Sequence, residues 1–425
     1  MRENYLHYIW KYGLFDSLDL KSTEEEKIEI LHRGDHNAHA GPDFFSARIN
    51  IGGTVWAGNV EIHIKSSDWY RHQHHKDPAY DNVILHVVLL HDKEILNSKG
   101  QHFPTLSLSN RIDQKHLEKF NQLITNQSEI LCATYLRDID DLIVLSMKER
   151  ALISRLQRKA HSMMINLDRT GFDLRRMFYE QIAINFGFKV NAEAFEELAK
   201  RLDLSIIQRH ADSRMQIEAL LFGVAGFLSN NFYDDYPIRL KNEYAFLNTK
   251  YKLQNMRIEA WKFGRLRPSN FPTIRIAQFA AFLFKNRGLV ELGGIRKTNE
   301  WKEMFEVVAN DYWTDHIRFD RPSKFRLKRL GKSSVENILI NSISPISFVQ
   351  GQKTNKEEAK QRALALLYEI PAEKNKAIEA WQKIGVKAKD AFDSQALLEL
   401  KNEWCDKKRC LNCSIGVSLM KHEFV

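Results

Sequence analysis

Two carboxylates stand where neighbouring strands could bring them together. Asp43 opens a strand-like run, 44–51, and Glu61 lies near the end of a second run, 55–64, with a Gly-Gly pair between the runs. Divalent cations bind carboxylate oxygens at short range, so two acids on adjacent strands are suited to hold one ion. The pattern predicts a site for Mg²⁺ or Mn²⁺ with Asp43 and Glu61 as the metal ligands.

The register of this hairpin decides whether the two acids meet. A two-residue turn between the runs leaves Asp43 opposite Ile62, on the other face of the sheet from Glu61. One extra residue, as a bulge at Gly58 or in a three-residue turn, would bring Asp43 beside Glu61. The metal site therefore requires such an irregularity. Without it, Asp43 would cap a loop and Glu61 would be a surface residue.

Two basic side chains share the strand face of Glu61. Side chains alternate along a strand, so Glu61, His63 and Lys65 point the same way. An imidazole could deprotonate a water molecule near neutral pH or act as a further ligand, and a lysine ammonium could orient that water. We therefore expect His63 and Lys65 to be catalytic together with Asp43 and Glu61.

Histidines are crowded near the start of the chain, where twelve of the sixteen fall within the first 116 residues. His72 and His74, with Asp77 after them, form a second candidate metal cluster, since histidines spaced in this way could bind zinc on an extended segment. The alternative is a hydrogen-bonded loop that covers the sheet. His86 lies inside the apolar run NVILHVVLL, and we expect it to be a core residue with its hydrogen bonds satisfied.

Three of the four cysteines are clustered. Cys405, Cys410 and Cys413 form a C-x4-C-x2-C pattern, and Cys132 or His422 could supply a fourth ligand for a structural zinc ion or an iron–sulfur cluster. The alternative is a set of reduced thiols packed at the end of a helix.

One segment of the chain is strongly basic. Residues 318–332 hold seven basic residues and one acid, with two phenylalanines among them, in a chain of net charge +9. Basic side chains can neutralise phosphates while aromatic rings stack on bases, although a solvated basic loop has the same composition. We expect nucleic acid as a partner, contacted by Arg321, Lys324, Arg326, Lys328 and Arg329.

The order of elements indicates an α+β fold. A helix over 1–15 precedes strands over 27–31, 44–51 and 55–64, and the buried run 82–90 predicts an internal strand of one mixed sheet. Amphipathic helices follow over 141–168, 173–187, 191–204, 212–228, 273–287, 355–369, 373–384 and 389–404. These patterns predict an N-terminal domain over 1–118 and a helical region over 119–425, with a subdivision near 250–270.

No run of eighteen apolar residues appears, and the first residues lack the apolar stretch of a secretory signal. We therefore expect no membrane association and a cytoplasmic location. The sequence gives no indication of the oligomeric state.

The hairpin resembles a known nuclease pattern. Pro42-Asp43, the hairpin and the acid at Glu61 resemble the PD-(D/E)xK nuclease superfamily, whose core is a mixed sheet like that of restriction endonucleases. The resemblance implies that Asp43 and Glu61 hold magnesium. His63 stands where that superfamily has its lysine, with Lys65 as a substitute, and Glu3 would be the additional acid of the first helix. Some of these nucleases also hold an iron–sulfur cluster with one distant and three clustered cysteines.

Nearly the whole chain is also similar to a bacterial family, domain-of-unknown-function family 2851, which brings no established activity. The matching segments are GPDFFSARI, GNVEIHIKSSDWYRH, DPAYDNVILHVV, RPSNFPTIRIAQ and CDKKRCLNCSIG. The residues and the two resemblances together lead us to expect a divalent-metal-dependent phosphodiesterase or nuclease acting on DNA or RNA. The alternative is a non-catalytic nucleic-acid-binding or scaffold protein that keeps a nuclease-like sheet.

Overall fold

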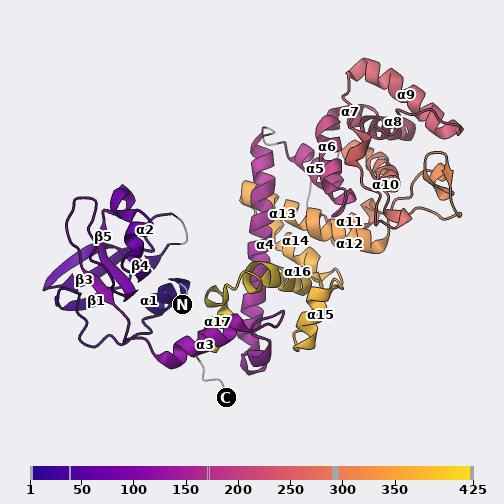
Figure 1. Cartoon of the computed structure of the whole chain (residues 1–425). Helices are drawn as coiled ribbons and strands as arrows, with labels where there is room; N and C mark the ends of the chain where they lie inside the picture. Colours follow the sequence, from indigo (N-terminus) through magenta and orange to yellow (C-terminus); the bar gives the residue numbers. More distant parts are fainter. Residues whose placement is uncertain (1–2, 38–39, 170, 172, 290–295, 422–425) are drawn as a thin grey trace. The chain divides into compact units, whose positions relative to one another are not determined.

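The computed structural model describes residues 3–37, 40–169, 171, 173–289 and 296–421 (Figure 1). It divides into two compact units, Met1–Met147 with Leu400–Val425, and Lys148–Glu399. This division differs from the expected boundary at residue 118. The reason is packing, because Phe120 and the C-terminal Leu411 and Met420 belong to the core of the first unit.

A mixed sheet forms the centre of the first unit. Its strand order is β1-β3-β4-β5-β6, with β2 also paired to β3, and the pairs β4–β5 and β5–β6 are parallel. The strands are β1 (Ile28–His32), β2 (Asp35–His36), β3 (Phe44–Ile51), β4 (Thr54–Lys65), β5 (Val83–Leu90) and β6 (Thr105–Ser107). The predicted α+β class and the internal position of residues 82–90 are confirmed; β6 was not expected.

Apolar side chains explain how the first helix meets this sheet. Helix α1 (Glu3–Tyr12) packs against β4 and buries Tyr5, Leu6 and Ile9 completely. Ile62 of β4 and Val87 of β5 belong to the same core. Burial of these residues positions the N-terminal turn of α1 near the end of β4.

A bulge in β3 sets the register of the hairpin. The turn has two residues, since Ile51 pairs with Thr54, but between the pairs Ala47–Gly58 and Phe44–Val60 the register shifts. Phe45 and Ser46 therefore face the single residue Asn59, and Ser46 has a left-handed φ of 59°. The expected irregularity exists, but on β3 and not at Gly58 on β4. The shift carries Asp43 to the level of Glu61.

The second unit is helical. Its elements include α4 (Asp141–Arg169, which begins in the first unit), α5 (Leu174–Phe186), α6 (Ala192–Arg201), α7 (Leu204–Arg209), α8 (Arg214–Val224), α9 (Asp235–Tyr251), α10 (Pro272–Lys285), α11 (Thr298–Met304), α12 (Lys332–Ile338), α13 (Ser344–Thr354), α14 (Glu357–Tyr368), α15 (Lys376–Lys383) and α16 (Ala391–Glu399). The eight predicted helices are all present. The sequence did not predict α7, α9 and α11–α13.

The expected subdivision near 250–270 is not seen in the described part of this unit. Residues between α9 and α10 form only short turns, η4 (Ile258–Ala260) and η5 (Pro268–Asn270). Met256 and Trp261 nevertheless pack in the same core as residues on both sides of them. A shared core keeps this unit in one piece.

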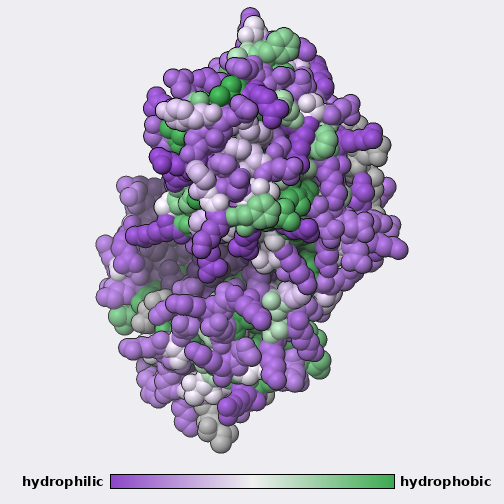
Figure 2. Space-filling view, turned by 90° about the vertical axis from the view of Figure 1, so that its right-hand side faces the viewer, coloured by the Kyte–Doolittle hydropathy of each residue, from purple (hydrophilic) through white to green (hydrophobic). Residues whose placement is uncertain are grey.

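Among the described residues, no helix combines the length and apolarity that crossing a bilayer requires. The face drawn in Figure 2 is mostly hydrophilic, with apolar side chains in small groups.

We predict that Gly58→Ala loosens the sheet. A Cβ at Gly58 would lie 2.4 Å from Ile84 Cγ2 and 2.7 Å from the carbonyl oxygen of Asn82, so β5 would have to move. Overpacking of this kind costs about 1–3 kcal/mol. Hydrogen-exchange mass spectrometry should show faster exchange in peptides from 44–90. Gly264→Ala, where the added Cβ would have no heavy atom within 4 Å, is the matched control; unchanged exchange in Gly58→Ala would contradict the prediction.

Candidate functional site

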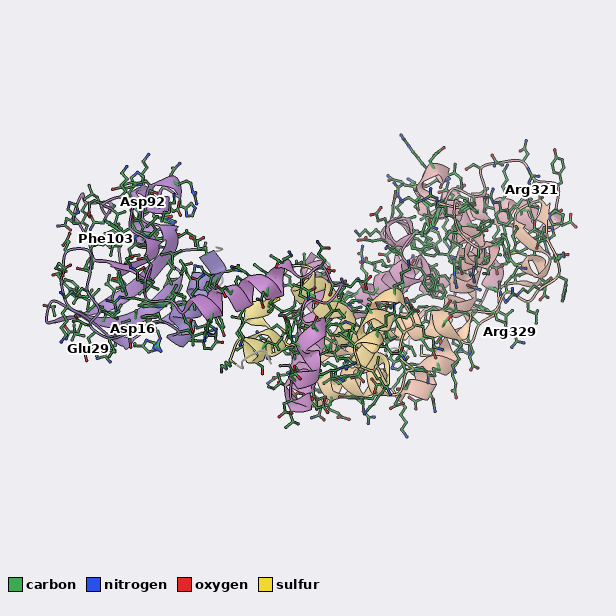
Figure 3. The ribbon with its side chains drawn as sticks, turned by 60° about the horizontal axis from the view of Figure 1, so that its bottom comes forward. Asp16, Glu29, Asp92, Phe103, Arg321 and Arg329 are labelled. Atoms are coloured by element: carbon green, nitrogen blue, oxygen red, sulfur yellow. The ribbon has the colours of Figure 1, made fainter. Side chains whose placement is uncertain are left out.

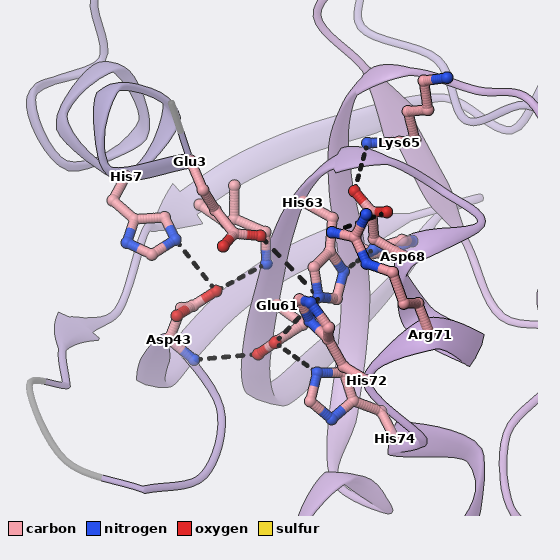
Figure 4. Close-up of polar contacts among 12 residues, drawn as sticks. Glu3, His7, Asp43, Glu61, His63, Lys65, Asp68, Arg71, His72 and His74 are labelled. Carbon is pink, nitrogen blue, oxygen red and sulfur yellow. Dashed lines mark hydrogen bonds and ion pairs between the residues drawn. The ribbon is translucent and has the colours of Figure 1, made fainter. Parts of the chain in front are cut away.

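Two hydrogen bonds to the backbone bring the side chains of Asp43 and Glu61 to the same place (Figure 4). The backbone N–H of Asp43 donates to Glu61 Oε2 over 3.1 Å, and the N–H of Ile62 donates to Asp43 Oδ2 over 2.9 Å. The side chain of Glu61 is buried, whereas that of Asp43 is 20% exposed. The structure thus brings together the two predicted acids, with a path to solvent on the side of Asp43.

His63 lies next to these acids. Its Nε2 is 3.6 Å from Glu61 Oε1 and 4.0 Å from Glu3 Oε1, while its Nδ1 is 2.8 Å from Nε2 of the buried His86 on β5. The side chain of His63 is 1% exposed and that of Glu3 38%. Glu3, expected as the additional acid of the first helix, therefore stands at the open side of the site.

Two further histidines join His63. His63 Nε2 is 3.1 Å from His72 Nδ1, and His74 Nε2 is 3.2 Å from Glu61 Oε1. The ligand atoms of His63, His72 and His74 all lie within 4.8 Å of one another. We name these three residues the imidazole cluster. The chain reverses at Gln73, whose φ is 63°, and so directs His72 and His74 to the same point.

Neighbouring side chains hold the imidazole cluster in place. The ring of Tyr80 stacks on His74 with a centroid distance of 3.8 Å, and Trp69, on α2 (Asp68–Arg71), packs against the rings of His74 and His86. The indole N–H of Trp69 donates to the carbonyl oxygen of Leu96 over 3.0 Å. Aromatic packing and this hydrogen bond restrict the rotamers of the cluster.

The electrostatics favour a protonated Glu61 and neutral His63 and His86. Burial, with the charge of Asp43, raises the pKa of Glu61 to about 9. Burial, with the neighbouring His86, His74 and His72, lowers the pKa of His63 to about 2. The pKa of His86 falls to about 3, chiefly through burial. Like charges held close together favour a proton or a cation between them.

His7 partly compensates the acids. Burial alone would lower the pKa of His7, but its hydrogen bond to Asp43 and the charge of that carboxylate raise it. Its Nε2 lies 3.3 Å from Asp43 Oδ2. Asp43 thus has a partner on α1.

Three contacts among these donors have the spacing of metal ligands. In a tetrahedral zinc site, nitrogen and oxygen ligands about 2.0–2.1 Å from the metal are about 3.4 Å apart. The contacts of Glu61 Oε1 with His63 and His74, and of His63 with His72, span 3.1–3.6 Å. The Nδ1 of His63 contacts His86. In metal-ligating histidines, the ring nitrogen that does not bind the metal usually has such a hydrogen-bond partner. Asp43 adds a carboxylate at the edge of this group.

Two predicted site residues lie elsewhere. Lys65 is exposed at the end of β4, and its ammonium group points away from the acids (Figure 4). The reason is distance: Lys65 follows His63 by two residues, and two residues advance a strand by about 6.6 Å. Asp77 instead accepts a hydrogen bond from the N–H of Ala79 over 2.9 Å and caps the short helix η2 (Pro78–Tyr80). His63 takes the place expected for Asp77 beside His72 and His74.

Sequence patterns did not indicate the contacts that His7, His86 and Tyr80 make at this site. His7 follows Glu3 by four residues, a spacing that puts both on one face of α1, and this was a usable signal. His86 pairs across the parallel strands with Glu61, a register that only the fold reveals. Tyr80 comes from a turn whose path has no sequence signature.

The basic segment belongs to the second unit. Arg321, Lys324, Arg326 and Arg329 are exposed, and among the described residues their side chains form no hydrogen bond or ion pair; Arg321 and Arg329 are labelled in Figure 3. Lys328 was wrongly expected to contact nucleic acid. It is buried, and its Nζ donates to the carbonyl oxygens of Thr314 and Arg326.

The two phenylalanines of the basic segment differ in exposure. Phe325 is 77% exposed, whereas Phe319 packs against the core of the second unit. Only Phe325 is therefore open to stacking on a base.

The four cysteines come together in the first unit. Cys132, Cys405, Cys410 and Cys413 line one cavity. Burial raises the pKa of Cys132 to about 12, and the nearby thiols of Cys413 and Cys410 add to the increase. The structure thus brings Cys132 to the other three; His422, the alternative fourth ligand, lies outside the described residues.

Comparison with known proteins gives one match. Residues 3–376 match the model of a family described as "Protein of unknown function (DUF2851)". No curated protein and no solved structure matches the chain.

We predict that Glu61→Gln makes the metal-free protein more stable at high pH. The folded-state pKa of Glu61 is raised from 4.5 to about 9, so the unmutated protein loses stability as the pH rises between these values. A glutamine has no such proton to lose. Thermal unfolding with a chelator should give a midpoint difference that favours Gln and grows with pH. Glu29→Gln, at an exposed position on β1, is the control; parallel pH curves for Glu61→Gln and the unmutated protein would refute the prediction.

Proposed function

The chain belongs to the DUF2851 family, and we propose that its first unit is a divalent-metal-dependent phosphodiester hydrolase. The observation that carries this proposal is the meeting of Asp43 and Glu61 beside the imidazole cluster. A buried carboxyl group beside a second acid, next to imidazoles that burial keeps neutral, is a typical environment for a catalytic cation.

The order of elements supports the proposal. Apart from the short strand β2 and two short 3-10 helices, the order is helix α1, antiparallel strands β1, β3 and β4, helix α2 and the parallel strand β5. The resemblance to the PD-(D/E)xK superfamily implies this order. Asp43 directly precedes β3 and Glu61 lies near the end of β4, where this resemblance would put the metal ligands. Fold order alone does not give a function, so the side chains carry the argument.

Asp43 and Glu61 would supply oxygen ligands to the ion and His63 a nitrogen ligand. A bound divalent ion would polarise a phosphoryl oxygen and stabilise its developing charge. Magnesium binds imidazole poorly, so this donor set favours Zn²⁺ or Mn²⁺ over the expected Mg²⁺. Glu61 must lose its proton for the ion to bind, and therefore binding should release a proton.

The remaining side chains orient these ligands and move protons. His86 fixes the ring of His63 through the contact between Nε2 and Nδ1. His72 is exposed and touches His63 Nε2, so it can accept a proton at the site and release it to solvent. His7 holds Asp43 by its ion pair.

A second candidate function is non-catalytic nucleic-acid binding. The exposed side chains of the basic segment, with Phe325 among them, favour a polyanionic partner in either case. The two candidates differ in one measurement, metal-dependent cleavage of single- and double-stranded DNA and RNA in the presence of Mg²⁺, Mn²⁺ or Zn²⁺.

We predict that Asp43→Asn and Glu61→Gln each abolish metal-dependent cleavage and weaken ion binding measured by calorimetry. Each change removes one negative charge from the ion's ligands while keeping the shape of the side chain. Asp77→Asn is the matched control, because asparagine keeps the cap of η2 and the residue lies outside the site. Cleavage retained by Asp43→Asn, or a protein that binds none of the three ions, would refute the enzyme proposal and leave the binding function.

We predict weaker DNA binding, with a smaller dependence of the affinity on salt, when four basic residues are replaced together by alanine. These residues are Arg321, Lys324, Arg326 and Arg329. Each lost phosphate contact lowers the slope of log K against log salt by about 0.9 for duplex DNA. Fluorescence anisotropy over a salt series measures both quantities. The control variant loses the same number of charges, because four exposed lysines are replaced by alanine: Lys374, Lys376, Lys383 and Lys387. Equal slopes in the two variants would show that the basic segment is not the contact.

A further inference from the structure

The four cysteines come from distant parts of the chain but share one cavity. Cys132 precedes the short helix η3 (Ala133–Asp138). The other three lie where short elements end or begin, namely η9 (Leu400–Cys405), η10 (Cys410–Asn412) and α17 (Ser414–Lys421). In the described part of the chain, none of the four is in a disulfide. All belong to the first unit.

The cavity between the thiols is unsuited to water. The centre of a water-sized sphere can occupy ≈ 20 Å³ there, above the roughly 10–15 Å³ that one buried water needs. Its wall exposes only carbon and sulfur, with Leu123, Leu131 and Trp404 between the cysteines. A water there would lack the polar partners that hold ordered waters.

The backbone around the cysteines is shaped to hold them. Lys408 adopts a left-handed φ of 53°, and the N–H groups of Lys408 and Arg409 donate to the carbonyl oxygens of Cys405 and Trp404. Helix α17 approaches so closely that a Cβ at Gly416 would lie 2.2 Å from the carbonyl oxygen of Cys410. The segment 405–413 therefore folds as a tight turn that presents its three thiols inward.

The spacing of the sulfurs selects the class of metal centre. Sulfurs 2.3 Å from one zinc ion in a tetrahedron are about 3.8 Å apart. Among the described residues, no three of the cysteine sulfurs lie within 4.8 Å of one another. In a [4Fe–4S] cluster each of four cysteines binds its own iron, so the cysteine sulfurs surround a larger body and stand farther apart. Four cysteines around an apolar space fit this second arrangement.

We propose that Cys132, Cys405, Cys410 and Cys413 bind a [4Fe–4S] cluster that fills this cavity. Four thiols would release their protons as four iron–sulfur bonds form. Positive charge is available nearby, since Lys401 stands close enough to act on the Cys405 thiol and Lys408 on that of Cys410. The cluster links the C-terminal turn to the segment at Cys132 and closes the first unit.

The test is the metal content of the full chain purified without oxygen and reconstituted with ferrous and ferric iron in equal amounts and with sulfide. We expect about four iron atoms and four sulfide ions per chain, with the visible absorption and Mössbauer spectrum of a [4Fe–4S] cluster. One zinc per chain in place of iron, or no bound metal after reconstitution, would overturn the proposal.

Variants test the assignment of ligands. Cys132→Ser and Cys410→Ser should each lose most of the iron, whereas Ser414→Ala, next to Cys413 in the sequence, should keep it. Circular dichroism separates loss of the cluster from loss of the fold. Because a cysteine variant could also fail to fold, the iron content of the unmutated chain decides the proposal by itself. Full iron content in Cys132→Ser, with an unchanged spectrum, would overturn the four-cysteine assignment.

Discussion

The candidate site depends on one extra residue in β3. Without the bulge at Phe45 and Ser46, the alternation of the strand would place Asp43 on the face opposite Glu61. With it, Glu61 accepts a hydrogen bond from the backbone N–H of Asp43, and Asp43 accepts one from the N–H of Ile62. Strand β4 can still bury Val60 and Ile62 on its other face. The bulge thus allows an apolar core and a polar site to share one hairpin. Bulges are often found beside active sites for this reason.

The buried polar groups that result are costly without an ion. Glu61 lies beside Asp43 and near Glu3, and its raised pKa reflects the burial of mutually repelling groups. His63 and His86 are held neutral by the same burial. The Nδ1 of His86 has no hydrogen-bond partner among the described residues. A protein selected for stability alone would replace such groups by apolar ones, so their presence is a physical argument for function.

The sequence was most informative where periodicity is strong. The run NVILHVVLL predicted an internal strand, and the long amphipathic segments predicted eight helices within a few residues of their ends. The acids were found because Asp43 and Glu61 flank a hairpin. The predictions that failed concern the position and burial of single side chains, which depend on the three-dimensional fold. Lys65 has the right parity but lies too far along the strand, and Asp77 caps a turn. Lys328 is buried, with its ammonium group bonded to backbone carbonyl oxygens.

The need for three-dimensional information also explains the wrong domain boundary. The same long-range contacts connect the two proposed metal centres. Local patterns could not show that the last segment returns to the first unit, because the contacts of Leu411 and Met420 join residues far apart in the sequence. These two side chains pack in the same core as Tyr5 and Ile9 of α1, and η10 contacts α1. Helix α1 carries Glu3 and His7, which face the acids. A centre that fixes the cysteine segment would therefore also fix α1, and through it the open side of the candidate site.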